Sequence, residues 1–329
     1  MKALVTGGGG FLGKAIVRRL RERGDIVRSF SRHAHPALTG MGVEHCRGEL
    51  GDAGAVERAA EGCDIVFHVA AKAGVWGPYE EFYQANVLGT KHVIDACRRH
   101  GIKRLVYTSS PSVVFDGTDM EGVDETVPYP EHFEAFYPQT KAEAEQLVLQ
   151  ASDQTLATVA LRPHLIWGPE DNHLVPRILE RGAKGALRKI GSRECLADTI
   201  YIDNAALGHL QAADHLDVGS AVAGKAYFIS QGEPMPIWDV VNRILNAGGL
   251  PPVTRTISPA LAYNLGAFLE KVFVLLKLKG EPRMTRFLAR ELSTSHWFDL
   301  SAARQDFGYQ PEVSFDEGMT RLREWLLTQ

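Results

Sequence analysis

The sequence predicts an α/β protein built on a doubly wound parallel sheet, followed by a smaller C-terminal α+β part. Short apolar segments alternate with helical patterns through the first half of the chain, an order typical of a parallel sheet covered by helices. The segments ALVT at 3–6 and DIVFH at 64–68 show no polar alternation, as expected of strands buried on both faces. The regularity fades after Gly168, where loops and proline-rich corners follow.

Each element of the first half is predicted from its local pattern of apolar residues. The expected strands are residues 2–6, 26–30, 65–69, 105–109 and 158–161, and the expected helices are 13–23, 53–61, 84–100 and 141–151. We therefore expect a first domain over residues 1–166, to which a segment near 197–230 returns, and a second domain over 167–329.

Composition excludes several classes of protein. A chain of 329 residues has room for about two domains. With 45% apolar and 23% charged residues it has the composition of a folded protein, and a net charge of −4 argues against nucleic acid as a partner. The four cysteines show no metal-like spacing. We expect them to be reduced and mostly buried, and we expect no metal site.

Glycine is in surplus, with 32 residues, and its densest cluster lies at 7–10. The segment TGGGGFLG at 6–13 places Gly7, Gly10 and Gly13 where the first strand meets the first helix. Such glycines permit a tight turn, let a pyrophosphate approach the backbone, and let helix and strand pack closely, while the helix N-terminus offers free N–H groups. The alternative interpretation of these glycines is a tight turn that binds no ligand. This context favours a Rossmann-type dinucleotide-binding domain, with Phe11 and Leu12 also in the loop.

The end of the second strand predicts which dinucleotide binds. An NAD site usually has an acidic residue there, about 20 residues past the glycines, to hold the ribose 2′-hydroxyl. Here the strand ends at Ser31 and Arg32, and Asp25 precedes it. A guanidinium suits a 2′-phosphate, so we predict NADPH as the cofactor. The alternative is that Arg32 is an ordinary surface arginine.

Tyr137 and Lys141 form a Tyr-x-x-x-Lys pair at the start of a helix, after the strand that ends near Ser110. The carboxyl ends of parallel strands face the cofactor crevice, and the spacing presents both side chains on one side of the helix. Reduction of a ketone needs a proton donor, and we expect the Lys141 ammonium to lower the pKa of the Tyr137 phenol toward the working range. Ser110 can hold the carbonyl, or simply cap a turn; a surface pair is the alternative for Tyr137 and Lys141.

These motifs together resemble the extended short-chain dehydrogenase/reductase family over nearly the whole chain. The resemblance rests on the glycine loop, HVAA at 68–71, NVLGT at 86–90, YTSS at 107–110, Tyr137-x-x-x-Lys141, LRPHLIWGP at 161–169 and YIDN at 201–204, and on pieces of the C-terminal tail, FDLS at 298–301, GYQP at 308–311 and Glu317-Gly318. It implies that Ser110, Tyr137 and Lys141 are catalytic. It also places further residues at the cofactor: Glu49, Leu50, Ala70, Ala71, Asn86, Pro163 and Ile166. Glu49 departs from the more usual aspartate at its position.

Within the family, the chain is similar to the 3β-hydroxysteroid dehydrogenase-like reductases. AAKAGVWG at 70–77 and SSPSVV at 109–114 resemble the bacterial reductases of 2-alkyl-3-oxoalkanoates in long-chain olefin biosynthesis. That likeness implies NADPH-dependent reduction of a hydrophobic 2-alkyl-3-keto acid to the 2-alkyl-3-hydroxy acid. It also implies a homodimer through the helices that begin near Asn86 and Tyr137, and a complex with other olefin-pathway enzymes.

Residues 260–278 form the one long apolar stretch, interrupted by Asn264, Glu270 and Lys271. They are too polar for a membrane span. We expect a buried or substrate-lining helix that accommodates alkyl chains, with contact to a membrane or a partner as the alternative. The apolar run after Met1 is too short for a signal peptide, so we expect a cytoplasmic protein that is membrane-peripheral at most.

Three other functions compete with this one. A sterol or 3β-hydroxysteroid dehydrogenase shares the chemistry but runs toward oxidation, usually with NAD. A nucleotide-sugar epimerase or dehydratase retains its oxidised cofactor, and a non-catalytic NADPH sensor usually lacks the Tyr-Lys pair. Three basic residues are candidates for binding a substrate carboxylate, although a solvated surface charge is the commoner role of such residues: Lys72, Arg193 and Arg283.

Overall fold

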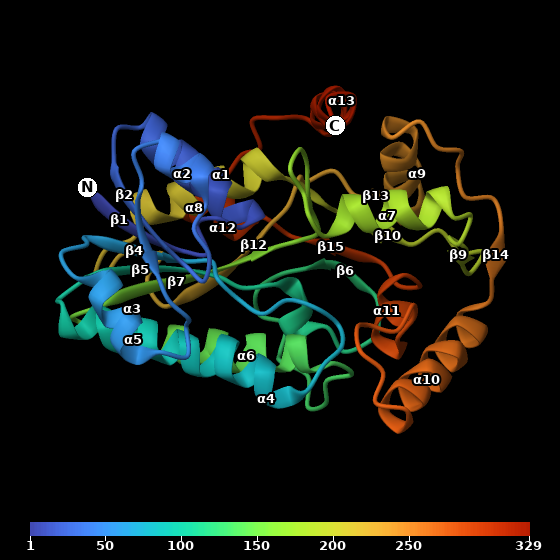
Figure 1. Ribbon diagram of the computed structural model, residues 1–329, viewed down its shortest axis with the longest axis horizontal. Coiled ribbons are helices and arrows are strands. Elements are labelled where there is room, and N and C mark those ends of the chain that lie inside the picture. The colour runs from blue at the N-terminus through green and yellow to red at the C-terminus, as the bar shows by residue number, and fades with distance from the viewer.

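The computed structural model describes residues 1–329, and a seven-stranded parallel sheet lies at the centre of its larger part (Figure 1). The strand order is β12-β7-β5-β4-β1-β2-β3. From β1 the chain first adds strands on one side, through β2 to β3, and then on the other side, from β4 onward. Every neighbouring pair is parallel. The strands are β1 (Lys2–Thr6), β2 (Ile26–Ser31), β3 (Glu44–Arg47), β4 (Ile65–His68), β5 (Arg104–Thr108), β7 (Ala157–Pro163) and β12 (Lys225–Ile229). The predicted doubly wound sheet is confirmed.

Helices cover both faces of this sheet (Figure 1). One layer contains α1 (Phe11–Glu22) packed on α8 (Ile202–His215). The other contains α3 (Ala53–Ala60), α5 (Gly89–Arg99) and α6 (Phe136–Gln150). Both layers are needed because β1, β4, β5 and β7 are buried along almost their entire length.

Two elements of the first half differ from the sequence prediction. The expected helix 84–100 is divided into a π-helical segment η1 (Tyr83–Leu88) and α5, and the short helix α4 (Tyr79–Phe82) precedes it. π-Helical turns are rare and frequently occur at functional sites. The strand β3 was not expected, because its sequence EHCR carries almost no apolar pattern. It pairs only with β2 at the edge of the sheet.

The smaller part of the molecule has its own four-stranded sheet, in the order β13-β10-β15-β6. Its strands are β6 (Met120–Val123), β10 (Leu196–Ala197), β13 (Met235–Pro236) and β15 (His296–Phe298). β6 comes from the first half of the chain, and β12 comes from the second half but lies in the large sheet. The chain therefore passes repeatedly between the two sheets.

The remaining elements connect or flank these two sheets. They are the helices α2 (Pro36–Gly40), α7 (Leu174–Ala183), α9 (Ile237–Ala247), α10 (Pro259–Leu275), α11 (Arg286–Glu291), α12 (Ser301–Phe307) and α13 (Phe315–Leu326), the short 3₁₀ turn η2 (Pro111–Val114), and the strands β8 (Ile166–Trp167), β9 (Lys189–Ile190), β11 (Ile200–Tyr201) and β14 (Thr256–Ile257).

The expectation that residues 260–278 form a buried helix is wrong. They form α10 and the turn after it, at the outer edge of the smaller part (Figure 1). Only Ala262, Gly266 and Glu270 of this helix are buried. No helix in the structure is long and apolar enough to cross a membrane.

Candidate active site

The glycine loop joins β1 to α1 and leaves a helix N-terminus open. Gly7 has φ +69°, and a side chain there would meet the backbone of Ala70 at 3.0 Å. A Cβ on Gly13 would lie 2.2 Å from the Gly7 carbonyl oxygen. Gly10 is the N-cap of α1 and offers no side-chain cap, so the first N–H groups, from Phe11 and Leu12 onward, have no helical partners. This cradle fits a pyrophosphate.

A buried network fixes the strand ends below this loop. The Thr6 Oγ1 atom accepts hydrogen bonds from the backbone N–H groups of Val69 and Ala70, both at 3.1 Å, and contacts the His68 Nδ1 atom at 2.8 Å. The His68 Nε2 atom contacts the Thr90 Oγ1 atom at 3.0 Å. Burial lowers the pKa of His68 to about 3, so this imidazole is neutral and its role is structural.

The end of β2 carries basic groups and no acidic one. Arg32 is exposed, and its carbonyl accepts a hydrogen bond of 3.1 Å from the Arg47 guanidinium. The Ser31 hydroxyl contacts the His45 Nε2 atom at 3.0 Å. Glu44 lies at the opposite, amino end of β3. The sequence predicted Ser31 and Arg32 as cofactor-binding residues. It did not indicate His45 and Arg47, because these two residues reach the end of β2 only through the pairing of β2 with β3.

The predicted adenine-side residues follow β3. Glu49 is exposed, and Leu50 packs against Gly89, where a Cβ would approach the Leu50 Cβ to 2.7 Å. The carbonyl oxygen of Leu50 accepts a hydrogen bond of 2.8 Å from the His92 ring. These contacts hold the loop after β3 against α5, close to the predicted cofactor crevice.

Asn86 holds the loop that follows β4. Its Oδ1 atom accepts from the Lys72 N–H at 2.7 Å, and its Nδ2 atom donates to the Lys72 carbonyl and to the Thr140 hydroxyl, both at 3.1 Å. The loop fixed in this way contains Ala70 and Ala71. Asn86 is 2% exposed, so any effect of this residue on a cofactor passes through the loop and through α6.

Pro163 ends β7, and Ile166 opens β8 shortly beyond it. Leu165 between them has φ 46°, a conformation rare for a branched side chain. The buried His164 contacts the Asp198 carbonyl through its Nδ1 atom at 2.7 Å. The chain therefore turns sharply at the carboxyl end of β7, on the same edge of the sheet as Ser110.

Ser110 and Tyr137 come together at this edge. Ser110 follows the end of β5 and caps η2, since its Oγ atom accepts from the Ser112 N–H at 3.2 Å. Tyr137 is the second residue of α6, and Pro138 is tolerated in its first turn. Burial raises the pKa of Tyr137, and a hydrogen bond with the Ser110 side chain opposes part of that rise. Ser110 thus serves both as a cap and as a neighbour of the phenol.

Lys141, one helical turn after Tyr137 on α6, is buried, with only 2% of its surface exposed. Its Nζ atom donates to the Thr108 carbonyl at 2.6 Å and lies 4.1 Å from the centre of the Tyr107 ring. Burial lowers the pKa of Lys141 to about 7, while the nearby Glu145 carboxylate opposes that change. The Tyr107 ring face and the Thr108 carbonyl both favour the charged form.

The expected lowering of the Tyr137 pKa is wrong. Burial, the largest cause, raises this pKa to about 12, and the carboxyl group of Glu291 raises it further. The Lys141 ammonium points to Thr108 and does not offset that burial. Glu291 ends α11, and burial raises its own pKa to about 7. Tyr137 is therefore a protonated phenol at neutral pH, the form that donates a proton.

A second buried charge network lies behind Lys141. Arg162 donates to both carboxylate oxygens of Glu145, at 3.0 and 2.6 Å, and the Tyr129 hydroxyl donates to Glu145 at 2.7 Å. Arg162 and Glu145 are almost fully buried. Glu145 lies one helical turn beyond Lys141 on α6. Local sequence carries no signal for this pair, because the partners come from different elements.

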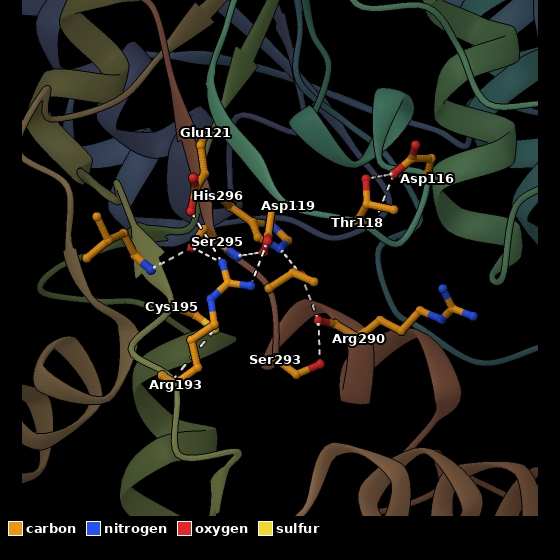
Figure 2. Close-up of polar contacts among 12 residues, drawn as sticks. Asp116, Thr118, Asp119, Glu121, Arg193, Cys195, Arg290, Ser293, Ser295 and His296 are labelled. Atoms are coloured by element: carbon orange, nitrogen blue, oxygen red, sulfur yellow. Dashed lines mark hydrogen bonds and ion pairs between the residues drawn. The ribbon is translucent and has the colours of Figure 1, made fainter.

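Two of the three basic residues considered for a substrate carboxylate, Lys72 and Arg193, are already paired with carboxylates. Lys72 pairs with Glu81 at 2.7 Å, and Arg283 is exposed. Figure 2 shows the Arg193 guanidinium among Asp119, Glu121 and Ser295, with Arg193 bonded to Asp119 at 2.7 Å. These contacts join the segments before β6, β10 and β15. Arg193 therefore stabilises the smaller sheet.

The nucleotide cradle and the Tyr-x-x-x-Lys pair at the carboxyl ends of the strands define an extended short-chain dehydrogenase/reductase, an NAD(P)-dependent oxidoreductase. The chain belongs to the 3-beta hydroxysteroid dehydrogenase/isomerase family, which matches residues 4–259.

Two relatives and one solved structure carry the comparison further. The chain is 55% identical to the 2-alkyl-3-oxoalkanoate reductase of Stenotrophomonas maltophilia, with 98% of each chain covered. It is 50% identical to the enzyme of the same name from Shewanella oneidensis, over 98% of this chain and 85% of that one. It is similar in structure to the UDP-glucose 4-epimerase of Thermus thermophilus in complex with NAD, with a TM-score of 0.74, 25% identity and 99% of each chain covered.

Proposed function

We propose that this protein reduces the 3-keto group of a 2-alkyl-3-oxoalkanoate to the 2-alkyl-3-hydroxyalkanoate, with NADPH as the reductant. The observation that carries the proposal is the arrangement of three residues: Ser110 follows the carboxyl end of β5, and Tyr137 and Lys141 lie in the first half of α6. The 55% identity to a reductase named for that substrate supports it.

Each residue has a distinct part in the reaction. NADPH supplies the hydride when it is bound. Tyr137, held protonated by a pKa of about 12, donates its proton to the alkoxide that develops on the substrate oxygen. Ser110 donates a hydrogen bond to the same oxygen and orients it. The charged Lys141 ammonium donates to the Thr108 carbonyl and so holds the end of β5, where Ser110 and Tyr137 meet.

The preference for NADPH rests on the basic end of β2. Arg32 and Arg47 lie side by side there, and Ser31 and His45 add polar groups. A 2′-phosphate would meet positive charge at this edge, whereas a free 2′-hydroxyl would find no carboxylate acceptor. The test is the Arg32→Asp variant, assayed with both cofactors. We expect kcat/KM to move toward NADH by about 100-fold; an unchanged ratio would show that the assignment is wrong.

The assembly and location of the protein complete the proposal. We propose a homodimer across α5 and α6, supported by the partly exposed aromatic cluster of Tyr79, Tyr83 and Phe136 beside these helices. We also propose a cytoplasmic location, contact with a membrane surface through residues 260–278, and a complex with other olefin-pathway enzymes. Light scattering of the purified protein tests the dimer; a monomer at micromolar concentration would contradict it.

A direct assay tests the substrate class. The stable 2-alkyl-3-hydroxy acid is offered with NADP⁺ beside a 3β-hydroxysterol, because the family includes hydroxysteroid dehydrogenases. We expect turnover of the branched acid. Turnover of the sterol alone would establish the sterol dehydrogenase instead, and purified protein carrying stoichiometric NAD would favour an epimerase.

A further inference from the structure

An apolar surface on α10 is exposed to solvent. It consists of seven of the ten exposed large hydrophobic side chains in the chain, and their exposed fractions range from 43% to 81%. Contiguous exposed apolar patches are uncommon on monomeric proteins and usually mark an interaction site. We call this set the α10 surface: Leu261, Leu265, Phe268, Val274, Leu275, Leu276 and Leu278.

The packing of α10 explains why these side chains remain exposed. The helix meets α11 through its small residues, and a Cβ on Gly266 would lie 2.6 Å from the Thr285 backbone. The Glu270 carboxylate accepts hydrogen bonds of 2.7 Å from both the backbone N–H and the Nε atom of Arg286. α10 therefore turns its small and acidic side toward the protein and its large apolar side outward, the reverse of an ordinary surface helix.

The charges around the α10 surface are positive. Lys271, Lys277 and Lys279 are exposed, and none of them forms an ion pair. Three acidic residues nearby are each paired with an arginine: Glu270 with Arg286, Glu281 with Arg177, and Glu134, which Tyr263 of α10 also contacts, with Arg290. An apolar helix face with an unpaired cationic rim matches an anionic lipid surface. A second copy of the chain would bring the same lysines together, which is unfavourable.

The face of α10 opposite the α10 surface packs against the loop that follows β4. Phe273 of α10 packs edge-on against Trp76, with the ring centroids 6.1 Å apart. Trp76 lies in the loop after β4, which also contains Ala70 and Ala71 and is held by Asn86. Phe273 lies on the same face of α10 as Gly266 and Glu270, so this contact packs the protein side of the helix against the loop after β4.

We propose that α10 and the turn through Lys279 dock the protein on an anionic lipid bilayer, lying on its surface without crossing it. A 2-alkyl-3-oxoalkanoate with two long alkyl chains partitions into lipid, so docking would place the protein where this substrate is concentrated; that last statement rests on the proposed function.

Vesicle binding by the full-length protein tests the docking surface. Wild type is sedimented with phosphatidylcholine vesicles, with and without phosphatidylglycerol, beside the double variant Phe268→Glu, Leu275→Glu. The matched control is Leu327→Glu, at an exposed leucine (79%) just beyond α13. We expect wild type and control to bind the anionic vesicles, with affinity falling as salt rises, and the double variant to bind about 100-fold more weakly.

Other outcomes overturn the proposal. One is that wild type does not bind anionic vesicles, and another is that the double variant binds them as well as wild type does. A third is that wild type binds no vesicles but forms a larger oligomer, and that the double variant does not form this oligomer. A short-chain, water-soluble 2-alkyl-3-hydroxy acid separates the two proposals. We expect wild type, the double variant and the control to turn over this acid at equal rates. If wild type binds vesicles but does not turn over the acid, the proposed function is wrong and the proposed docking surface stands.

Discussion

Replacing Lys141 with methionine is expected to stabilise the protein while abolishing its activity. Burial lowers the pKa of Lys141 from 10.5 to about 7, and a fall of that size corresponds to roughly 5 kcal/mol against the ammonium form in the folded state. The hydrogen bond to Thr108 and the Tyr107 ring offset about 2 kcal/mol of this cost. We therefore expect Lys141→Met to be more stable than wild type by about 2–4 kcal/mol at pH 6, since methionine fills a similar volume.

The pH dependence of this difference has a definite sign. The folded-state pKa of Lys141, about 7, lies below its ordinary value of 10.5, so the unfolded chain binds more protons between these values. Wild-type stability therefore rises with pH across this window, whereas the variant lacks that contribution. The advantage of the variant should be largest below pH 7 and should disappear toward pH 10.5.

Chemical denaturation at several pH values measures both quantities. The matched control is Lys91→Met, because Lys91 is exposed and pairs with Asp95 on the surface of α5; its effect should stay within about 0.5 kcal/mol. The reasoning is refuted if Lys141→Met is less stable than wild type at pH 6, or if its advantage is the same at pH 6 and pH 10.

Two further predictions concern groups around the site. Tyr107→Leu removes the ring face at Lys141, so the alkaline limb of kcat/KM should move down by about one pH unit, whereas Tyr107→Phe should keep the wild-type profile; identical profiles for both variants would contradict the ring's role. For Glu291, burial raises the folded-state pKa from 4.5 to about 7, so folding stability is lost as pH rises through that range. Glu291→Gln should therefore stabilise the protein by about 1–2 kcal/mol at pH 8 and by almost nothing at pH 4, and thermal melts at the two values check this.

The sequence predicted those parts of the structure that depend on neighbouring residues. The glycine loop, the buried strands and the Tyr137-Lys141 spacing are local patterns, and the parallel sheet they predict is confirmed. β3 was missed because an edge strand needs little apolar sequence. The expected helix 84–100 became partly π-helical, since Asn86 lies in the π-helical segment and bonds to both Lys72 and Thr140.

Properties that depend on distant elements were not predictable. The pKa of Tyr137 rises because burial outweighs the hydrogen bond with Ser110, and Glu291 adds to the rise from α11. Arg193 was a candidate for the substrate carboxylate, yet it pairs with Asp119. The apolar sequence of α10 indicated burial, but Gly266 and Glu270 turn the small side of the helix inward. In each case the deciding partner lies far away in sequence.

The rate at which wild type and Tyr137→Phe consume NADPH with a 2-alkyl-3-oxoalkanoate tests the central claim most directly. Phenylalanine keeps the ring but removes the proton that Tyr137 donates. We predict turnover by wild type and a rate at least about 100-fold lower in the variant, with NADPH binding retained when measured by fluorescence. If Tyr137→Phe consumed NADPH at the wild-type rate, Tyr137 would not be the proton donor and the account would be wrong.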